Sequence, residues 1–266
     1  ILSSFLAKKR SFVHITPFTR TVYPPPSLMQ LFDTTLDSPV ENIALDESLL
    51  LYAEQHNSDL DCLRVWEPNQ YAVVMGRSGK VEEELNLPAC QQDGVAVLRR
   101  ASGGGTVLTG PGCLMYALVL NLDQHPQFHD NQNCHDTILS ELIGILAPLD
   151  IHCQIQGFSD LVYQNRKVSG NSLRRTRSHV LYHGTLLCQF DLEKMSRYLT
   201  IPPRKPDYRN SRSHLDFVAN IGHDVEQLKQ ALIQHWAPDA ANGDIPRQLL
   251  NELLDSKYQD PHWYTP

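Results

Sequence analysis

A run of three glycines, Gly103 to Gly105, constrains the fold of this chain more than any other stretch, and it closely follows the alternating apolar run at 95–98. Because glycine has no Cβ, such a turn can adopt positive φ angles, and its backbone N–H groups can converge on one anion. Arg99 and Arg100 precede the run and add charge that matches a phosphate or a carboxylate. A hairpin or bulge that needs glycine only for its geometry is the competing interpretation. The paired arginines favour a local anion site.

The stretches on either side of the glycine run have the pattern of strands. Residues 95–98 alternate, and residues 113–120 alternate and then become continuously apolar, as expected of a strand that returns. The glycine run is therefore expected on a strand-turn-strand unit and not at the start of a helix. This excludes a Walker loop, whose lysine and hydroxyl are also absent, and a dinucleotide fingerprint, which needs a strand-to-helix turn.

The charge balance limits the kind of partner. The 266 residues carry a formal net charge of -7, which argues against a broad basic face for nucleic acid. A hydrophobic content of 41% supports one main domain with appendages. The six cysteines lie singly, as in reduced cytosolic enzymes, and no apolar run is long enough to span a bilayer. We therefore expect a cytoplasmic protein with a small phosphate-bearing ligand and with neither nucleic acid nor membrane as a partner.

The sequence divides into three parts. Residues 1–30 form an amino-terminal arm that ends after the prolines at 24–26, which favour an extended segment. The arm carries basic residues and no acid, so organellar targeting stays open, although an ordinary irregular arm is the favoured interpretation. Residues 31–222 form the expected catalytic domain. Residues 223–266 form a short helical extension, with helices expected at about 225–236 and 246–254.

Other elements follow from apolar periodicity and turn residues. Ser38 and Pro39 predict a helix start, and apolar residues at helical spacing continue it to about residue 52. Short strands are expected at 62–66 and 71–76, and helices at about 136–146 and 192–199.

Two polar clusters resemble metal sites only superficially. The consecutive acids Glu82 to Glu84 would point in different directions on a helix, so they predict a solvated face. His125, His129, Cys134 and His135 lack the usual spacing of structural zinc ligands, and we expect a surface loop that enters a helix. No metal site is predicted.

A second constellation spans residues 160–175. It has the pattern of a strand, a two-residue turn at Gln164 and Asn165, and a second strand that enters a glycine bend. Lys167 lies on that second strand near Gly170, where it could direct its ammonium group at an anion whose position the backbone fixes. Taken alone, such a lysine is more often a solvated strand residue. The strand at 182–187, with its internal glycine, gives the functional interpretation its weight.

Three ordered segments together resemble the lipoate-protein ligase A family, within the superfamily of biotin and lipoate ligases and octanoyltransferases. They are residues 99–107, residues 160–161 with 166–170, and residues 183–187. The segment 42–47 is similar to the family's amino-terminal helix, and Met75 to Arg77 to the strand end before its ligand loop. The resemblance runs from about residue 41 to about residue 220.

The resemblance implies an α+β fold with a mixed, largely antiparallel sheet flanked by helices, as in biotin ligases and class II synthetase cores. It implies a ligase that converts lipoate and ATP to lipoyl-adenylate and pyrophosphate and then acylates a lysine of a carrier domain. The implied ligands are ATP with Mg²⁺ and lipoate or octanoate. The implied partner is a lipoyl domain of a 2-oxoacid dehydrogenase complex or the glycine cleavage H protein.

The resemblance also implies the roles of particular residues. Lys167 would be the catalytic residue and would contact the carboxyl oxygen and the α-phosphate, stabilising charge that develops at both. The residues implied in substrate binding are Arg77, Arg99, Arg100, Ser102, Gly103, Gly104, Gly105, Ser169, Gly170, His183 and Gly184. An apolar tunnel would hold the eight-carbon chain, with burial contributing about 0.8 kcal/mol per methylene.

Two departures from the family pattern keep alternatives open. The family commonly has a histidine after the glycine turn, where this chain has Leu108 to Gly112 with Thr109 among them, a run closer to the octanoyltransferases. The residues after 220 are also too few for the family's accessory domain, so either a separate polypeptide supplies it or the protein transfers acyl groups without ATP. The alternatives are an ATP-independent octanoyl or lipoyl transferase with Cys153 as nucleophile, Cys113 being a weaker candidate, and a non-catalytic lipoate-binding module. A packed structural Cys153 is the favoured interpretation of that residue.

Overall fold

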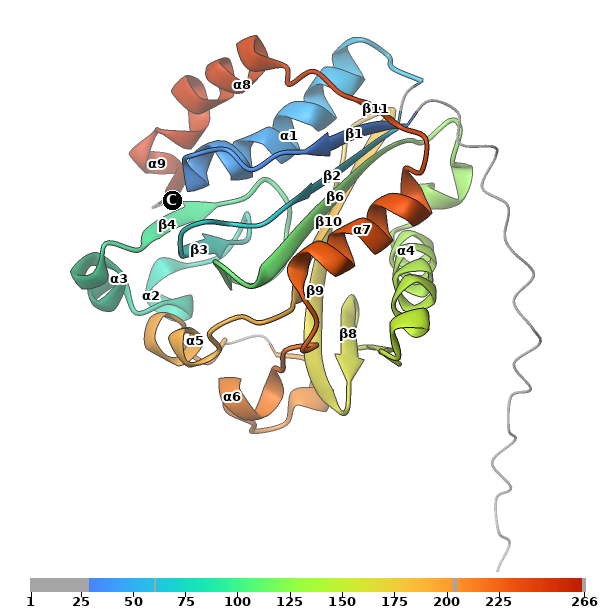
Figure 1. The fold of residues 1–266 in the computed structure, drawn as a ribbon. Coiled ribbons are helices and arrows are strands. Elements are labelled where there is room, and N and C mark those ends of the chain that lie inside the picture. The colour runs from blue at the N-terminus through green and yellow to red at the C-terminus, as the bar shows by residue number, and fades with distance from the viewer. Residues whose placement is uncertain (1–28, 60, 203–204, 265–266) are drawn as a thin grey trace, which may run out of the picture.

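A large mixed sheet forms the centre of the molecule (Figure 1). The computed structural model describes residues 29–59, 61–202 and 205–264, so nearly all of the arm predicted at 1–30 lies outside the described residues. The sheet has eight strands in the order β11-β1-β2-β6-β10-β9-β8-β7. Only β1 pairs in parallel, with β2 and β11, and all other neighbours are antiparallel. The predicted mixed, largely antiparallel α+β fold is confirmed. The strands are β1 (Gln30–Asp33), β2 (Cys62–Trp66), β6 (Cys113–Asn121), β7 (Gln154–Gln156), β8 (Asp160–Tyr163), β9 (Arg166–Arg175), β10 (His179–Leu187) and β11 (Ala241–Asn242).

The central strand β6 shows why the large sheet has a hydrophobic core on each face. Successive side chains of a strand point to opposite faces. The even-numbered residues 114–120 pack in a core with α4 (Asn131–Leu146) and α7 (Val225–Trp236). Ala117 and Val119 pack in a second core with α1 (Pro39–Gln55) and α8 (Arg247–Leu253). β6 is therefore buried on both sides, as its continuous apolar end predicts.

A second, three-stranded sheet carries the glycine run. Its order is β4-β3-β5, with β3 (Ala72–Met75) in the middle, β4 (Ala96–Arg99) parallel to it and β5 (Val107–Thr109) antiparallel. The predicted strands at 62–66, 71–76 and 95–98 are found. The predicted pairing is corrected: the chain returns from the glycine run as β5, on the far side of β3, and β6 belongs to the large sheet. A third core lies between this sheet and α3 (Leu87–Asp93), α5 (Glu193–Tyr198) and α6 (His214–Phe217).

The hairpin predicted around Lys167 is present. β8 and β9 pair antiparallel, and the two turn residues have positive φ, 48° at Gln164 and 63° at Asn165. Two left-handed residues fit the right-handed twist of the flanking strands. The turn sets Lys167 opposite Val162, and a register shift between Val162 and Leu161 then places Asp160 opposite Gly170.

Helix positions agree with the apolar spacing at both ends of the described chain. α1 begins at Pro39, although the Ser38 side chain makes no capping hydrogen bond. α4 begins at Asn131, earlier than predicted, because Asp130 caps it by accepting from the Asn133 N–H. The segment after 222 contains α7, α8 and the short α9 (Pro261–Tyr264), and it packs on the same cores as the rest. Within the described residues, no helix combines the length and apolarity that crossing a membrane requires.

Candidate functional site

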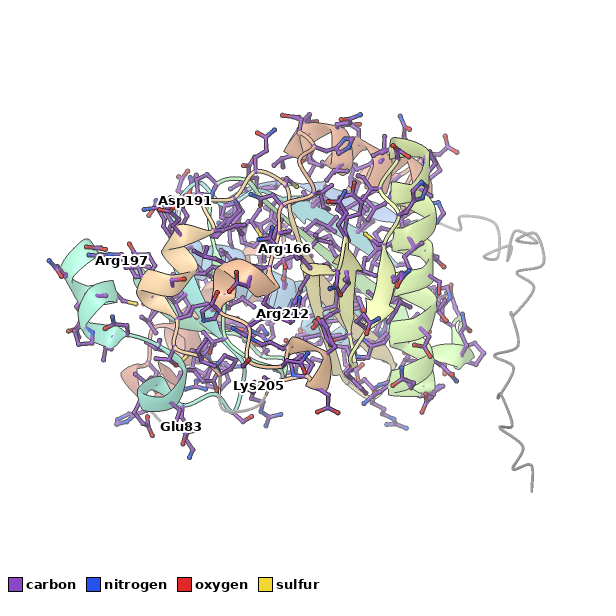
Figure 2. All side chains as sticks on the ribbon, turned by 90° about the horizontal axis from the view of Figure 1, so that it is seen from below. Glu83, Arg166, Asp191, Arg197, Lys205 and Arg212 are labelled. Atoms are coloured by element: carbon purple, nitrogen blue, oxygen red, sulfur yellow. The ribbon has the colours of Figure 1, made fainter. Side chains whose placement is uncertain are left out.

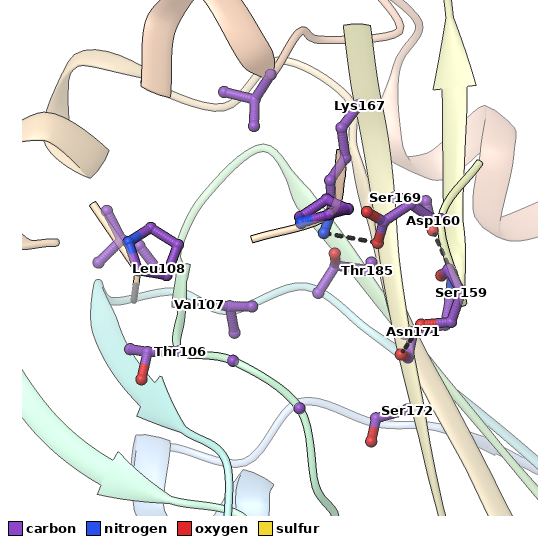
Figure 3. A pocket seen from close by; sticks show the side chains of 18 of the residues that line it. Thr106, Val107, Leu108, Ser159, Asp160, Lys167, Ser169, Asn171, Ser172 and Thr185 are labelled. Atoms are coloured by element: carbon purple, nitrogen blue, oxygen red, sulfur yellow. Dashed lines mark hydrogen bonds and ion pairs between the residues drawn. The ribbon is translucent and has the colours of Figure 1, made fainter. Parts of the chain in front are cut away.

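A cavity of about 810 Å³ lies between the three-stranded sheet, the large sheet and the segment 205–218, which we call the strap. The glycine turn, defined as residues 100–106, lines one side together with β5. β9 and β10 line the opposite side, and the strap adds polar and aromatic side chains. Figure 3 shows Thr106, Val107 and Leu108 across the cavity from Lys167, Asp160 and Asn171. A cavity of this size fits a small-molecule ligand.

The backbone of the glycine turn approaches β3 so closely that only glycine fits. A Cβ on Gly76 would lie 1.9 Å from the carbonyl oxygen of Gly104, and Gly104 itself has a φ of 88°. The Arg77 N–H also donates to the Ser102 carbonyl at 2.8 Å. Geometry therefore requires glycine at positions 76 and 104, whereas a Cβ on Gly103 or Gly105 would meet nothing within 4 Å.

The Arg100 guanidinium braces the turn from inside. Its Nε donates to the Ser102 hydroxyl at 3.0 Å, and its terminal nitrogens donate to the carbonyls of Gly103, Gly105 and Val74. Since the C=O and N–H of a planar trans peptide point in opposite directions, the Gly104 N–H faces away from Arg100. No described residue accepts a hydrogen bond from the N–H groups of Gly103, Gly104 or Gly105. These amides are available to an anionic ligand.

A buried hydrogen-bond chain supports this brace. The Ser102 hydroxyl lies 2.6 Å from His183 Nε2, and His183 Nδ1 lies 3.1 Å from the Asp46 carboxylate. Asp46 also accepts from Arg64 at 2.6 Å. Burial alone would raise the pKa of Asp46, but Arg64 and His183 hold it below the ordinary value, so the carboxylate is ionised.

The proton positions in this series of hydrogen bonds follow from the two groups at its ends, Arg100 and Asp46. Arg100 can only donate and the Asp46 carboxylate can only accept. Ser102 therefore accepts from Arg100 and donates to His183 Nε2, and His183 Nδ1–H donates to Asp46. The geometry resembles a Ser-His-Asp triad. Ser102, however, is only 1% exposed and does not line the cavity, so its role is to orient the turn.

Lys167 faces the glycine turn from β9. Its ammonium lies 2.7 Å from the Asp160 carboxylate, whose other oxygen accepts from the Tyr208 hydroxyl at 2.7 Å. Burial and the neighbouring Asp160 raise the pKa of Tyr208, so its hydroxyl stays protonated and donates. A Cβ on Gly170 would lie 2.9 Å from the Lys167 ammonium, so glycine at this position leaves room for the lysine.

Asn171 lines the cavity from β9, opposite Gly184 of β10. Its Nδ2 donates to the Ser159 carbonyl at 2.8 Å and to the Ser169 hydroxyl at 3.0 Å. A Cβ on Gly184 would lie 1.8 Å from Asn171 Oδ1. Gly184 and Ser169 therefore shape the cavity through Asn171, a residue that the sequence analysis did not single out.

Glu84 corrects the prediction that the acids at 82–84 form only a solvated face. Glu82 and Glu83 are exposed, but Glu84, at the end of α2 (Val81–Glu84), lines the cavity. Its Oε2 accepts from the Thr106 N–H at 3.0 Å and from the Thr106 hydroxyl at 2.6 Å. Glu84 therefore fixes the end of the glycine turn.

Arg99 lies outside the cavity, where it could not bind a substrate held there. It is 1% exposed and donates to the carbonyls of Gly76 at 2.9 Å and Gly79 at 2.8 Å, and it does not line the cavity. Its Nε donates to the Trp263 carbonyl at 2.7 Å, and the Trp263 indole N–H donates back to the Arg99 carbonyl at 2.9 Å. Arg99 joins β4 to α9. Arg77 is exposed and likewise outside the cavity lining.

The cysteine alternative finds no support in the position of Cys153. This residue is 7% exposed, belongs to the main hydrophobic core and is not among the cavity-lining residues. Burial raises the pKa of its thiol to about 11, so the thiolate is scarce near neutral pH. Cys113 is fully buried as well.

The position where the family commonly has a histidine is structural in this chain. Thr109 is buried at the end of β5, and its hydroxyl donates to the Ala72 carbonyl at 3.2 Å. The histidines considered as zinc ligands have separate partners: His125 pairs with Asp61, and His135 contacts the Tyr182 hydroxyl.

The structure thus brings most of the predicted site residues together. Lys167 and seven of the predicted binding residues line one cavity: Arg100, Gly104, Gly105, Ser169, Gly170, His183 and Gly184. Ser102 and Gly103 are not among the lining residues, but both accept hydrogen bonds from Arg100. Asp46, Glu84, Tyr208 and Arg209 also line the cavity and were missed. A signal existed for Asp46, which falls at helical spacing between the apolar residues Ile43 and Leu50.

Comparison with known proteins identifies the family of this chain. The model of the lipoyl protein ligase A/B catalytic domain matches residues 38–237. The chain is 30% identical over 244 residues to lipoate-protein ligase A of Blochmanniella floridana, covering 87% of this chain and 69% of that protein. It is 24% identical over 242 residues to lipoate-protein ligase LplJ of Bacillus subtilis, covering 86% and 70%.

Two solved structures share the fold. A bipartite lipoate protein ligase from Thermoplasma acidophilum, described with its E2 lipoyl domain, superposes with a TM-score of 0.76 at 22% identity, over 89% of this chain and 96% of that one. A lipoate-protein ligase A bound with ATP superposes with a TM-score of 0.74 at 21% identity, over 89% and 98%.

Proposed function

Because the chain belongs to the family of lipoyl protein ligase A/B catalytic domains, we propose that it is a lipoate-protein ligase. In this proposal it converts lipoate and ATP to lipoyl-AMP and pyrophosphate and then transfers the lipoyl group to a lysine of an apo lipoyl domain. The observation that carries the proposal is that Lys167 and the glycine turn line one cavity, with Lys167 across it from Thr106 at the end of the turn.

This arrangement suits adenylation because the reaction brings two anions together. The lipoate carboxylate must attack the α-phosphorus of ATP, and their mutual repulsion opposes the approach. Backbone amides on one side and an ammonium group on the other stabilise the charge that develops between them. The Asp160 carboxylate keeps the Lys167 side chain extended along β9 until a ligand competes for it.

The apolar part of the cavity supports an acyl substrate. Val74, Val107, Leu108, Met115 and Leu187 line it together with Ile43 and Phe217. Burial of the eight-carbon chain against such side chains contributes about 0.8 kcal/mol per methylene. Lipoate and octanoate differ at the far end of this chain, so both fit the proposal.

Magnesium fits the site as a companion of the nucleotide. Among the described residues, no group of three His, Cys, Asp or Glu side chains could hold a metal ion. Mg²⁺ is commonly bound by substrate phosphates with one or two carboxylates. We therefore assign no protein ligand to it.

The proposed partner is a lipoyl domain of a 2-oxoacid dehydrogenase complex or the glycine cleavage H protein, in the cytoplasm. The domain limits 31–222 and 223–266 are also part of the proposal.

The test is to incubate the protein with lipoate, ATP and an apo lipoyl domain, with and without a separate accessory domain, and to follow the mass of the carrier. We expect lipoylation that requires ATP and Lys167. Transfer from a lipoyl or octanoyl thioester or carrier without ATP would favour the acyltransferase instead. Binding of lipoate without turnover of either donor would indicate a non-catalytic module.

A further inference from the structure

The strap contains a buried cation, Arg209, that has no role in the proposed adenylation as described above. Arg209, at the end of the short helix η3 (Asp207–Arg209), is 4% exposed and lines the cavity. Its guanidinium lies over the Phe217 ring at 4.7 Å and donates to the Arg212 carbonyl at 3.3 Å and to His214 Nδ1 at 3.4 Å. Burial holds the pKa of Arg209 below its ordinary value, as expected of a cation with little compensation.

No carboxylate compensates this charge. Within the described residues, no Asp or Glu lies within ion-pair distance of Arg209, and the neighbouring Arg212 adds further positive charge. Asp160 and Asp207 are two of the acids that line the cavity. Asp160 is already engaged by Lys167 and Tyr208. Asp207 lies two residues before Arg209, is exposed and makes no ion pair with it.

His214 does not supply negative charge either, and its state is fixed by its contacts. His214 Nε2 lies 3.1 Å from the Thr200 carbonyl, which can only accept, so Nε2 carries the proton and Nδ1 accepts from Arg209. Burial and Arg209 lower the pKa of His214, which keeps the ring neutral. Arg209 is therefore surrounded by neutral and cationic groups.

An uncompensated buried charge is costly, and the natural counter-charge is a ligand in the cavity that Arg209 lines. Other cations extend the same region. Lys205 lines the cavity and is exposed, and the Arg212 guanidinium lies 5.1 Å from the Phe217 ring. Figure 2 labels Lys205, Arg166 and Arg212 toward the middle of this face, and the acids Glu83 and Asp191 toward its left side.

We propose that Arg209, with Lys205, forms a second anion subsite that binds the β- and γ-phosphates of the nucleotide. This inference rests on the proposed function, in which the glycine turn and Lys167 hold the α-phosphate. When a carboxylate oxygen of the acyl substrate bonds to the α-phosphorus, the bond from that phosphorus to the bridging β-oxygen breaks. The electron pair leaves with pyrophosphate, and Arg209 neutralises the charge that accumulates there.

The test measures equilibrium binding by calorimetry, without turnover, so that it is independent of acyl transfer. Inorganic pyrophosphate, ATP and AMP are titrated into the wild type, Arg209→Gln and Arg209→Lys, with Arg247→Gln as a control of equal charge change. Arg247 is exposed on α8 and does not line the cavity. We expect Arg209→Gln to weaken the binding of pyrophosphate and of ATP at least tenfold, and the binding of AMP less than twofold. Arg209→Lys should recover part of the affinity, and Arg247→Gln should bind like the wild type.

Other outcomes overturn the inference. If Arg209→Gln lost affinity for AMP and for ATP equally, Arg209 would lie at the α-phosphate. If its affinities for all three ligands were unchanged, Arg209 would not belong to the nucleotide site. If Arg209→Gln lost affinity only for an apo lipoyl domain titrated in the same way, the subsite would belong to an acidic protein surface. Absence of pyrophosphate and ATP binding to the wild type would also contradict it. Failure of the proposed function is distinct, because it would leave pyrophosphate binding intact while no lipoyl-AMP forms. Thermal unfolding of each variant shows whether the strap remains folded.

Discussion

At the scale of single residues, the site depends on groups that orient other groups. Arg100 draws the carbonyls of the glycine turn inward, and Ser102, His183 and Asp46 hold Arg100 in place. Glu84 fixes the other end of the turn through Thr106. These residues build an anion site from backbone amides, and most of them reach the ligand only indirectly.

Gly76→Ala tests the close approach of β3 to the turn. The new Cβ would lie 1.9 Å from the Gly104 carbonyl oxygen, so the turn must move. A displacement of about 1 Å at such a site can cost on the order of 100-fold in rate. We expect a loss of this size in lipoate-dependent pyrophosphate release, measured at saturating lipoate.

Gly144→Ala is the matched control for that substitution. Gly144 lies inside α4, and a Cβ there meets nothing within 4 Å. Alanine in a helix interior is favoured over glycine by up to about 1 kcal/mol. Activity should be unchanged and the melting temperature equal or higher. Equal activity in both variants would contradict the steric argument.

The hydrogen-bond chain predicts that Ser102 and His183 act as one unit. We expect Ser102→Ala and His183→Ala each to raise the KM for ATP while the KM for lipoate changes little. Because both substitutions break the same series of hydrogen bonds, the rise in the ATP KM of the double variant should be smaller than the two single effects combined. The corresponding coupling free energy should be about 0.5 to 3 kcal/mol. Strict additivity in the ATP KM would show that the two residues act independently.

At the scale of elements, strand positions could be predicted and strand partners could not. The alternation at 95–98 and 113–120 locates β4 and β6. However, β3, which begins 24 residues before β4, lies between β4 and β5 and pairs with both. Glu84 was misassigned for a related reason, since its partner Thr106 lies 22 positions away. The hairpin at Lys167 was predictable because its turn and register are local.

The turn between β9 and β10 predicts a measurable acid dependence. The Glu54 carboxylate on α1 accepts from the Ser178 N–H at 3.0 Å, the Ser178 hydroxyl at 2.6 Å and the Thr176 hydroxyl at 2.7 Å. Burial alone would raise the pKa of Glu54, but these donors lower it from 4.5 to about 2.

A lowered pKa in the folded state stabilises the protein above the unfolded-state value, and this stability is lost as the pH falls from 4.5 towards 2. Glu54→Gln should therefore lower the free energy of unfolding at pH 7 and flatten its decline between these pH values, as followed by urea unfolding. Glu82→Gln, at an exposed acid, is the control. Parallel pH curves for the wild type and Glu54→Gln would contradict this role.

At the scale of the whole molecule, two sheets and the strap enclose one cavity, while the carboxy-terminal helices close the outside. α8 packs on α1, and α9 joins β4 through Trp263 and Arg99. The sequence showed three motifs in order, but only the fold shows that Asp46, Glu84 and Tyr208 contact them, since those contacts join segments far apart in the chain.

The cysteines give a prediction for the whole chain. All six are buried and free of disulfides, and burial raises the pKa of Cys62, Cys134 and Cys188 to about 12. A thiol reagent such as DTNB at pH 8 should label almost none of them in the native protein and all of them after unfolding.

Cys153→Ala should keep ligase activity within about twofold of the wild type, as expected for a residue without a chemical role. Rapid native labelling of Cys153 with loss of activity would instead support the cysteine mechanism.

Lipoate-dependent release of pyrophosphate from ATP, compared between the wild type and Lys167→Met, tests the proposed ligase activity most directly. Lys229→Met, at a lysine paired with Asp33 and outside the cavity lining, is the control. We expect release by the wild type and by the control, and a loss of about 100- to 1,000-fold in Lys167→Met with little change in melting temperature. Release at the wild-type rate by Lys167→Met, or no lipoate-dependent release by the wild type even with an accessory domain present, would contradict a ligase built around Lys167.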